Sequence, residues 1–574
     1  MTCFLRFSGA SLAASDGTQI PTPTPPLALG AALLLMSSPL FMADVSGQSA
    51  ASISAPWVSD QADGTYKNPV LHADYSDPDV VRVGDDYWMT ASSFSHVPGL
   101  PILHSRDLVN WTLVNHALPA LVPGAHFETP RHGAGVWAPS IRHHAGLFWI
   151  FYPDPDFGFY VITATDPRGK WSEPHLLKAG RGLIDCCPLW DDDGRAWLVH
   201  GWAKSRSGIN NRLTVHEMSP DGKRLLDEGR VVVDGDQMTG WRTIEGPKFY
   251  KRDGWYFIFA PAGGVAEGYQ AIFRARSPEG PYENRVVLAQ GDTPVNGPHQ
   301  GAWVETPRGE HWFFHFQEIE AHGRVVHLQP MRWREDGWPV MGEDADGDGT
   351  GQPVLRHTKP DLPAQPESVP ATSDDFAGGR PGLQWQWQGN PASDWIVTPP
   401  DGASLAGLRL RSVTTPDARS LWLAGNLLMQ KFPAPVFSAE VTLALDAKVA
   451  GERAGLIIFG YDYGWIGLRR TADGGVELVQ ALCSKADKDG QETVAATVPW
   501  PAGMPVRLRV TVAADRRCSF SYRNAAGGDF VGLGESFLAT SSRWVGAKVG
   551  VFANAPAVTG GGGHADFASF VVAD

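Results

Sequence analysis

Apolar and polar residues alternate with a period of two along most of this chain, which is the pattern of half-buried β-strands. Between residues 65 and 342, five segments share one plan: an extended run, a tight turn rich in Asp and Gly, and an aromatic strand. Such turns between alternating strands predict β-hairpins. The segments are VVRVGDDYWMTAS from Val80, SIRHHAGLFWIFY from Ser140, LWDDDGRAWLVHG from Leu189, KFYKRDGWYFIFA from Lys248 and WVETPRGEHWFFHF from Trp303.

Each hairpin carries an aromatic marker, and successive markers lie 48 to 61 residues apart, a length that suits a four-stranded unit. No segment between them shows long helical periodicity. Five such units within residues 60–342 predict a five-bladed β-propeller. An open stack of sheets is the alternative, but it would leave strand edges unprotected. The markers are Trp88, Trp149, Trp197, Tyr256 and Trp312.

The second half of the chain predicts a further all-β domain. Residues 343–372 are rich in Pro, Asp and Gly, so they are predicted to be a linker. Their DADGDGTG stretch begins like an EF-hand loop, but Leu355 occupies the twelfth position, where calcium needs a Glu, so we interpret the stretch as solvated. In residues 373–574, LRLRSV from Leu408 and VRLRVTV from Val506 alternate, whereas LIIF from Leu456 and VGVFA from Val549 are typical of strands buried on both faces. Together they predict a β-sandwich.

The composition of the chain limits the classes of molecule that the protein is expected to bind. The formal net charge of −14 disfavours nucleic acid and anionic membranes. The 22 Trp residues offer flat apolar faces with a polar edge, which suit sugar rings, although packing in β cores explains most of them.

The N-terminus is expected to direct export. Residues 27–36 form an apolar run that is too short to cross a bilayer and suits the core of a signal peptide, so we expect residues 1–52 to be a signal peptide and extension. The protein would then be periplasmic or secreted; a disordered tail is the alternative. No other segment is predicted to span a membrane.

Five cysteines are too few for a disulfide scaffold. The pairing of Cys483 with Cys518 stays open. The adjacent Cys186 and Cys187 do not have zinc-ligand spacing, and we expect two buried thiols rather than a vicinal disulfide.

One position recurs in all five repeats, 11 or 12 residues before each marker. In a propeller the first strand of each blade lines the central axis, so these positions should meet around one funnel. Three acids that converge there would repel one another and shift each other's pKa values, an arrangement that costs stability and indicates function. The alternative is that the acids are turn or cap residues. The occupants are Asp77, Trp137, Asp185, Glu245 and Gln300, with His299 beside the last.

Paired carboxyl groups among aromatic residues fit glycoside hydrolysis, in which one carboxylate deprotonates a water and a protonated acid donates to the leaving oxygen. No G-x-S-x-G elbow, Walker-A loop or H-E-x-x-H motif competes with this interpretation.

Six motifs carry a family resemblance: NPVLHADYSDPD from Asn68, VWAP from Val136, LID from Leu183, IEGPK from Ile244, NGPHQG from Asn296 and GRVVHLQP from Gly323. Together they resemble glycoside hydrolase family 43, the β-xylosidases, α-L-arabinofuranosidases and arabinanases on a five-bladed propeller. The resemblance implies an inverting mechanism with Asp77 as general base, Asp185 as the acid that raises the donor's pKa, and Glu245 as general acid. Base and acid should then lie ~6.5–9.5 Å apart.

The resemblance also implies substrate-binding residues. Phe94 and Trp137 match aromatic positions of the sugar pocket, with blade packing as the alternative, and Arg324 matches an arginine that reaches sugar hydroxyls, with a surface charge as the alternative. His299 matches a histidine that helps to hold a central Ca²⁺ in many relatives, often through water; a histidine that is only hydrogen-bonded is the alternative. No cofactor is expected to be required beyond such a structural ion.

The resemblance implies an exo-acting enzyme that releases β-D-xylosyl or α-L-arabinofuranosyl units from xylan or arabinoxylan fragments. We favour a β-xylosidase because residues 373–574 resemble the concanavalin-like domain of the family's β-xylosidases. That domain is expected to pack on the propeller and narrow the pocket mouth rather than to bind polysaccharide. The pentose, the substrate length and the oligomeric state stay open.

Two other functions are weighed. A retaining fructan hydrolase would be expected to contain an N-D-P-N nucleophile motif and an E-C-P acid motif. This chain has S-D-P-D and E-G-P instead. A non-catalytic carbohydrate-binding protein would be expected to lack at least one acid, and all three are present.

Overall fold

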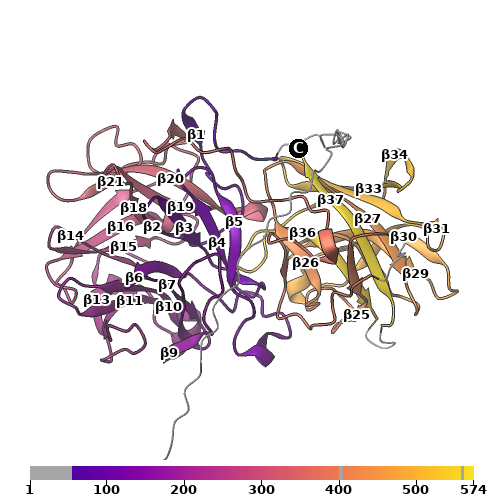
Figure 1. Cartoon of the computed structure of the whole chain (residues 1–574), viewed down its shortest axis with the longest axis horizontal. Coiled ribbons are helices and arrows are strands. Elements are labelled where there is room, and N and C mark those ends of the chain that lie inside the picture. The colour runs from indigo at the N-terminus through magenta and orange to yellow at the C-terminus, as the bar shows by residue number, and fades with distance from the viewer. Residues whose placement is uncertain (1–54, 400–404, 557–560) are drawn as a thin grey trace, which may run out of the picture. The chain divides into compact units, whose positions relative to one another are not determined.

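The computed structural model describes residues 55–399, 405–556 and 561–574, in which nearly all regular structure is β-strand (Figure 1). Strands β2 to β21 form five antiparallel four-stranded sheets, and within each sheet the strands follow chain order. The predicted five-bladed β-propeller is therefore confirmed. The predicted signal peptide lies outside the described residues, within which no helix is long and apolar enough to cross a membrane.

The five blades follow one another along the chain. The first comprises β2 (Asp79–Val83), β3 (Asp86–Thr90), β4 (Gly99–Ser105) and β5 (Thr112–Leu118). The second comprises β6 (Ser140–His144), β7 (Leu147–Asp154), β8 (Gly158–Ala164) and β9 (His175–Ala179). The third comprises β10 (Leu183–Trp190), β11 (Ala196–Trp202), β12 (Arg212–Met218) and β13 (Arg230–Asp234). The fourth comprises β14 (Lys248–Arg252), β15 (Trp255–Ala262), β16 (Tyr269–Ala275) and β17 (Glu283–Leu288). The fifth comprises β18 (His299–Glu305), β19 (His311–Ile319), β20 (Gly323–Trp333) and β21 (Pro339–Met341).

A hydrophobic core fills each interval between neighbouring blades. Tyr87 belongs to the core shared with the fifth blade, whereas the next residue, Trp88, belongs to the core shared with the second blade. Because successive strand residues point to opposite faces, a blade buried on both sides needs apolar residues at consecutive positions. This requirement explains the aromatic runs in the second strand of each hairpin.

The ring closes without a strand shared between the first and last blades. Residues before the first blade lie along β20 instead: Leu71 forms a β-bridge with Val326, and the Tyr66 hydroxyl donates to the Leu328 carbonyl at 2.8 Å. Just upstream, β1 (Thr65–Lys67) pairs with β22 (Arg356–Thr358). The stretch 343–372, predicted to be a linker, thus contains a strand, because its backbone pairs with the segment before the first blade.

The C-terminal region contains an eight-stranded and a seven-stranded sheet. The first comprises β23 (Gln386–Trp387), β25 (Val413–Thr414), β26 (Leu427–Lys431), β28 (Arg453–Phe459), β29 (Tyr463–Arg470), β30 (Val476–Cys483), β31 (Thr493–Trp500) and β36 (Lys548–Ala555). The second comprises β24 (Leu408–Arg411), β27 (Phe437–Asp446), β32 (Val506–Val512), β33 (Arg517–Asn524), β34 (Gly527–Gly532), β35 (Phe537–Leu538) and β37 (His564–Ala573). Short helical turns are η1 (Gly124–Phe127), α1 (Lys204–Ser207), η2 (Gly235–Gln237), η3 (Glu320–His322), η4 (Ala377–Gly379) and η5 (Ala486–Lys488).

The packing of the two sheets confirms the predicted β-sandwich. The alternating apolar residues of β32, beginning with Val506 and Leu508, lie in the core between the sheets. In β28, Leu456 also faces this core, whereas Ile457 faces a second cluster on the opposite side of its sheet. The continuous LIIF run is therefore buried on both faces, as its pattern predicts.

Asp74 joins the sandwich to the propeller. Its carboxylate accepts the backbone N–H of Arg324 on β20 and the backbone N–H of Gly546 in the sandwich, both at 2.9 Å. A side chain at Gly323 would meet the Gly546 nitrogen at 2.7 Å, so glycine allows the two backbones to approach this closely. The loop 541–547 of the sandwich is held in this way beside the axis end of β20.

The four cysteines in the described part of the chain are buried and form no disulfide. The expectation of two buried thiols at Cys186 and Cys187 is confirmed, and Cys483 and Cys518 are not bonded to each other.

Buried charges link the first strands of three blades near the axis. The Asp79 carboxylate is fully buried and accepts hydrogen bonds from the Ile141 N–H and the Arg142 guanidinium, both at 2.7 Å. The Lys248 ammonium lies 3.8 Å from the same carboxylate and donates to the Pro139 carbonyl and the Ser140 hydroxyl. One anion thus balances cations from the second and fourth blades.

Replacing Asp79 with Asn should strongly destabilise the protein, because Arg142 and Lys248 would become buried cations without a counter-charge. Breaking a buried ion pair in this way costs about 3–5 kcal/mol of unfolding free energy. Chemical denaturation would measure the change, with Asp63→Asn as control, since Asp63 forms an exposed ion pair with Arg356. Equal midpoints for the two variants would show that the Asp79 cluster does not stabilise the ring.

Candidate active site

A cavity of about 350 Å³ lies where the first strands of the blades begin. The five positions selected by the repeat spacing all contribute to its wall. The lining side chains with functional groups or aromatic rings are Asp77, Phe94, Trp137, Asp185, Thr243, Glu245, Gln300, Glu318, Arg324 and Trp544.

Unusual backbone conformations bring these side chains to the cavity. Asp77, Asp185 and Gln300 have φ values of 55°, 58° and 45°, in the left-handed region that residues with a Cβ rarely adopt. Each such residue costs about 1–3 kcal/mol, and this strain clusters at functional sites. In the fourth blade the left-handed residue is Gly246, at φ 58°, directly after Glu245. The propeller therefore places a left-handed residue at the axis in four of its five blades, and in three of them that residue is not glycine and is strained.

Asp77 is held as a hydrogen-bond acceptor. Its Oδ2 accepts the hydroxyls of Ser76 and Ser92 at 2.6 and 2.5 Å, and its Oδ1 lies 3.3 Å from the Arg324 guanidinium. The Asp77 side chain is only 6% exposed. Asp77 is thus held by three donors, one of which, the Arg324 guanidinium, carries a positive charge.

Asp185 and Glu245 form a pair of neighbouring acidic side chains. Burial, with the charges of Glu245 and Asp77 nearby, raises the pKa of Asp185 to about 8. Asp185 Oδ2 accepts the backbone N–H of Gly246 at 2.8 Å, so Asp185 is connected directly to the turn that carries Glu245. The Glu245 side chain is 24% exposed, whereas Asp185 is buried below it. A site of this kind retains a proton near neutral pH, because like charges so close together do not both ionise readily.

Arg324 is not a surface charge. Its side chain is 7% exposed, and it contacts the Ser76 hydroxyl at 2.9 Å as well as Asp77 and Glu318. The aromatic residues also occupy the cavity wall: Phe94 and Trp137 pack edge to face with ring centroids 6.3 Å apart. Phe94 itself has a φ of 50° and forms a β-bridge with Val136.

His299 lies behind Glu245 rather than in the cavity wall. It is fully buried, and its Nε2 is 3.0 Å from Glu245 Oε1. The contact that the structure shows for His299 is with Glu245, and its expected contact with substrate stays a prediction. The Nδ1 of His299 is buried and has no hydrogen-bond partner in the described part of the chain.

In the part of the chain that the structure describes, the surroundings of His299 offer one unpartnered ring nitrogen but no cluster of carboxylates for a calcium ion. Ca²⁺ takes about six to eight oxygen ligands, but one nitrogen of His299 already contacts Glu245. Within the described residues, no group of three His, Cys, Asp or Glu side chains converges around His299. Calcium at the axis stays a prediction, and we derive no step through it.

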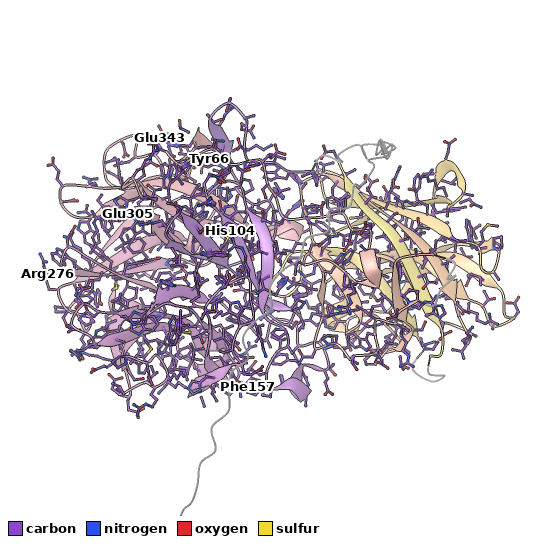
Figure 2. All side chains as sticks on the ribbon, viewed as in Figure 1. Tyr66, His104, Phe157, Arg276, Glu305 and Glu343 are labelled. Atoms are coloured by element: carbon purple, nitrogen blue, oxygen red, sulfur yellow. The ribbon has the colours of Figure 1, made fainter. Side chains whose placement is uncertain are left out.

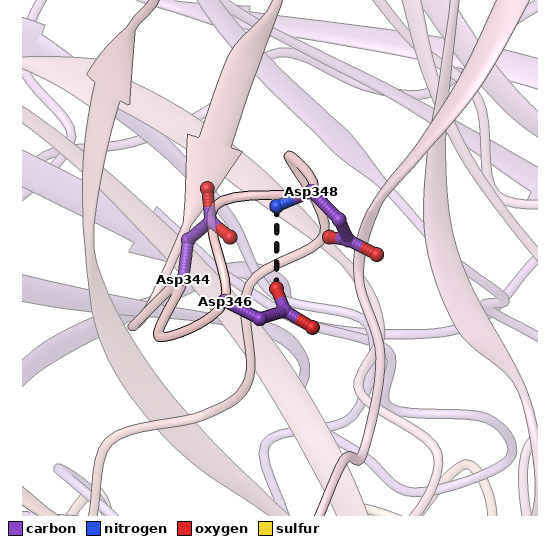
Figure 3. Close-up of side chains that lie close together, drawn as sticks. All are labelled: Asp344, Asp346 and Asp348. Carbon is purple, nitrogen blue, oxygen red and sulfur yellow. Dashed lines mark hydrogen bonds between the residues drawn. The ribbon is translucent and has the colours of Figure 1, made fainter.

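The acidic cluster that the described residues do contain lies in the EF-hand-like stretch (Figure 3). Asp344, Asp346 and Asp348 bring one carboxylate oxygen each within 4.8 Å of one another. The Asp344 carboxylate is already paired with Arg332 and Arg334, at 3.5 and 3.7 Å, and the other two residues are exposed. The cluster agrees with the solvated turn expected from the missing Glu.

Sequence reasoning missed one wall of the cavity. Trp544 comes from the sandwich, and its ring packs edge to face against Trp137 with centroids 6.1 Å apart. It lies in residues 373–574, which were expected to narrow the pocket mouth, but no residue of that domain was predicted to line the pocket. Gln300 belongs to the repeated axial position but had been assigned no role.

Comparisons with known proteins agree with this arrangement. Residues 66–339 match glycosyl hydrolases family 43, and residues 373–573 match the β-xylosidase C-terminal concanavalin A-like domain. The chain is 38% identical to a candidate β-xylosidase of Xylanibacter ruminicola, over 86% of each chain. It is 30% identical to a β-xylosidase of Formosa agariphila, over 86% of this chain and 88% of the other.

Solved structures show the same two-part architecture. The xylan β-1,4-xylosidase of Bacillus halodurans superposes with a TM-score of 0.77 at 25% identity, over 88% of this chain and 100% of the other. A propeller whose axial cavity gathers three carboxyl groups, followed by this sandwich, defines a carbohydrate-cleaving enzyme. The chain belongs to glycosyl hydrolase family 43.

Replacing Asp185 with Asn should stabilise the protein increasingly as the pH rises. A carboxyl group whose pKa is raised from 3.8 to about 8 binds a proton on folding, so wild-type stability falls as the pH rises through that range. For one group the loss is about 1.4 kcal/mol of unfolding free energy per pH unit. The asparagine retains an oxygen that can accept the Gly246 N–H.

Chemical denaturation of both proteins at several values between pH 5 and 7 would measure the difference in unfolding free energy. We expect the variant's advantage to widen across this range. A difference that stays constant or narrows would contradict the raised pKa of Asp185.

Proposed function

We propose that this protein is an inverting exo-glycosidase that releases terminal β-D-xylosyl or α-L-arabinofuranosyl units from xylan or arabinoxylan fragments. The observation that carries the proposal is the meeting of Asp77, Asp185 and Glu245, from three different blades, in one aromatic-walled cavity. Their environments differ: Asp77 is surrounded by donors, whereas Asp185 and Glu245 face each other's charge.

Asp77 acts as the general base. Its contacts with Ser76, Ser92 and Arg324 orient its carboxylate, so that it can take a proton from a water molecule. The water oxygen attacks the anomeric carbon on the face opposite the leaving group, which inverts the configuration. The predicted separation of about 6.5–9.5 Å between base and acid leaves room for this water.

Glu245 acts as the general acid. It is the more exposed member of the pair with Asp185, and it lines the cavity where a glycosidic oxygen would lie. As the bond to the anomeric carbon breaks, Glu245 gives its proton to the leaving oxygen and becomes a carboxylate. Asp185 is a positioning residue: the pair that it forms with Glu245 retains one proton, which Glu245 can donate, and its bond to the Gly246 N–H fixes the turn.

The choice of sugar rests on relatives. The Formosa agariphila relative is a β-xylosidase. A further relative from Bacteroides ovatus, 29% identical over 75% of this chain and 79% of its own length, is a non-reducing end α-L-arabinofuranosidase. We favour β-xylosidase activity, because residues 373–573 match the C-terminal domain that bears the β-xylosidase name. Export of the protein, based on residues 27–36, remains part of this proposal.

Purified protein assayed in parallel on nitrophenyl β-D-xyloside and nitrophenyl α-L-arabinofuranoside would test the activity. We expect hydrolysis of at least one, with a higher kcat/KM for the xyloside. Proton NMR should show the inverted anomer first, which for the β-xyloside is α-xylose. Binding of sugars without turnover of either compound would support the carbohydrate-binding alternative.

Variants of the two catalytic carboxyl groups should respond differently to the leaving group. Glu245→Gln cannot protonate the leaving oxygen, so its kcat on xylobiose should fall by about 100-fold or more. Its loss should be much smaller on dinitrophenyl β-xyloside, whose leaving group needs no acid.

Asp77→Asn should have a lower kcat on both substrates, because the attacking water must be deprotonated whichever leaving group departs. The ratio of the two kcat values therefore separates the roles. An equal loss on both substrates for Glu245→Gln would remove it as the general acid.

A further inference from the structure

We propose that the groove beside the catalytic cavity accepts leaving-group sugars that carry a carboxylate, and that Arg543 recognises this carboxylate. The inference rests on the proposed function and extends it to the part of the substrate that remains after the terminal sugar is cleaved. The ligand class is an oligosaccharide with a uronic acid on the sugar next to the cleaved bond.

The groove continues directly from the cavity. It encloses about 720 Å³, and Ala266, Glu318, Arg324 and Trp544 line both spaces. One side of the groove belongs to the propeller, and the other belongs to residues 541–545 of the sandwich. A substrate whose terminal sugar fills the cavity would therefore extend its next sugar between the two domains.

The charges that line the groove are balanced except at Arg543. Glu318 is paired with Arg324 at 3.4 Å, and Glu320 is paired with Arg516. Arg543 lines the groove and is exposed, and no carboxylate of the described residues lies within 4.0 Å of its guanidinium. The groove thus presents one cation that lacks a counter-charge.

Arg543 is also held in place before any ligand binds. Its guanidinium lies over the Trp544 ring, 4.5 Å from the ring centroid. Its stem passes over Gly133 of the propeller, where a Cβ would come within 2.4 Å of Arg543 Cγ. Gly133, at φ 76°, therefore leaves room for the arginine stem. These contacts with Trp544 and Gly133 restrict the side chain, and the fork of N–H donors on a guanidinium matches a carboxylate.

A carboxylate is favoured over a neutral sugar because of the surrounding charge. The protein carries a net charge of −14, which disfavours anions at long range. Salt screens that field beyond about 8 Å at physiological ionic strength, so the nearest unpaired charge decides binding within the groove. An unpaired guanidinium in the groove next to the cavity therefore favours a sugar that carries a carboxylate over a neutral sugar.

Three matched substrates would test the inference: a linear xylo-oligosaccharide, the same chain with a glucuronosyl group on the leaving-side sugar, and the methyl ester of that glucuronosyl group. Acid and ester have nearly the same shape and differ in charge. We expect the wild-type kcat/KM for the acid to exceed that for the ester by about fivefold or more at about 0.15 M salt, where the long-range charge of the protein is screened. The preference should shrink in 0.5 M NaCl.

Arg543→Gln should bring the acid-to-ester ratio of kcat/KM to about 1, and Arg543→Glu should bring it below 1. Arg276→Gln is the matched control, because Arg276 is also stacked on a tryptophan, 3.7 Å from the ring centroid of Trp255, but lies elsewhere on the propeller, far from Trp544 in the chain (Figure 2). The control should keep the wild-type ratio.

A wild-type ratio near 1, or an unchanged ratio in Arg543→Gln, would overturn the proposal while hydrolysis of the linear substrate upheld the proposed function. An equal loss on all three substrates in Arg543→Gln would show that Arg543 only packs against Trp544, which also overturns the proposal. If wild type cleaved none of the three, the proposed function and the groove proposal would fail together.

Discussion

The candidate active site requires the fold to hold together three carboxyl groups that repel one another. Asp77, Asp185 and Glu245 come from three blades and meet in one cavity, where burial and mutual charge raise the pKa of Asp185 to about 8. In a flexible chain such groups would move apart. Here each is attached to a different blade, and four of the five blades use a left-handed residue to turn the chain at the axis. The energy of blade packing holds the acids together.

Cations near the axis reduce the electrostatic repulsion between these carboxyl groups. Arg324 contacts Asp77 from the fifth blade, and the charge of Lys248 lowers the pKa of Asp185 against the effect of burial. Lys248 is itself fixed by the Pro139 carbonyl and lies near Asp79. Several blades contribute these charges, so a change in one blade alters the electrostatics of groups in the others. The candidate active site and the buried charges of the ring are therefore parts of one network.

The sandwich takes part in the site through position rather than through catalytic groups. Asp74 binds the N–H groups of Arg324 and Gly546, so one carboxylate fixes both an arginine of the cavity and the sandwich loop that carries Trp544. This loop closes one wall of the cavity and forms one side of the neighbouring groove. The expectation that the sandwich packs on the propeller and narrows the pocket agrees with these contacts.

Alternation and repeat spacing predicted the strands, the five repeats and the convergence of the three acids, because both patterns can be seen along the chain. Motifs indicated Arg324, Phe94 and Trp137. The packed structure was needed to show that His299 contacts Glu245, that β22 pairs with β1 and that Trp544 completes the cavity wall. These contacts join residues that lie 54, about 290 and 407 positions apart in the chain. No local pattern encodes such a pairing, since it depends on how whole blades and sheets pack and on which buried groups lack other partners.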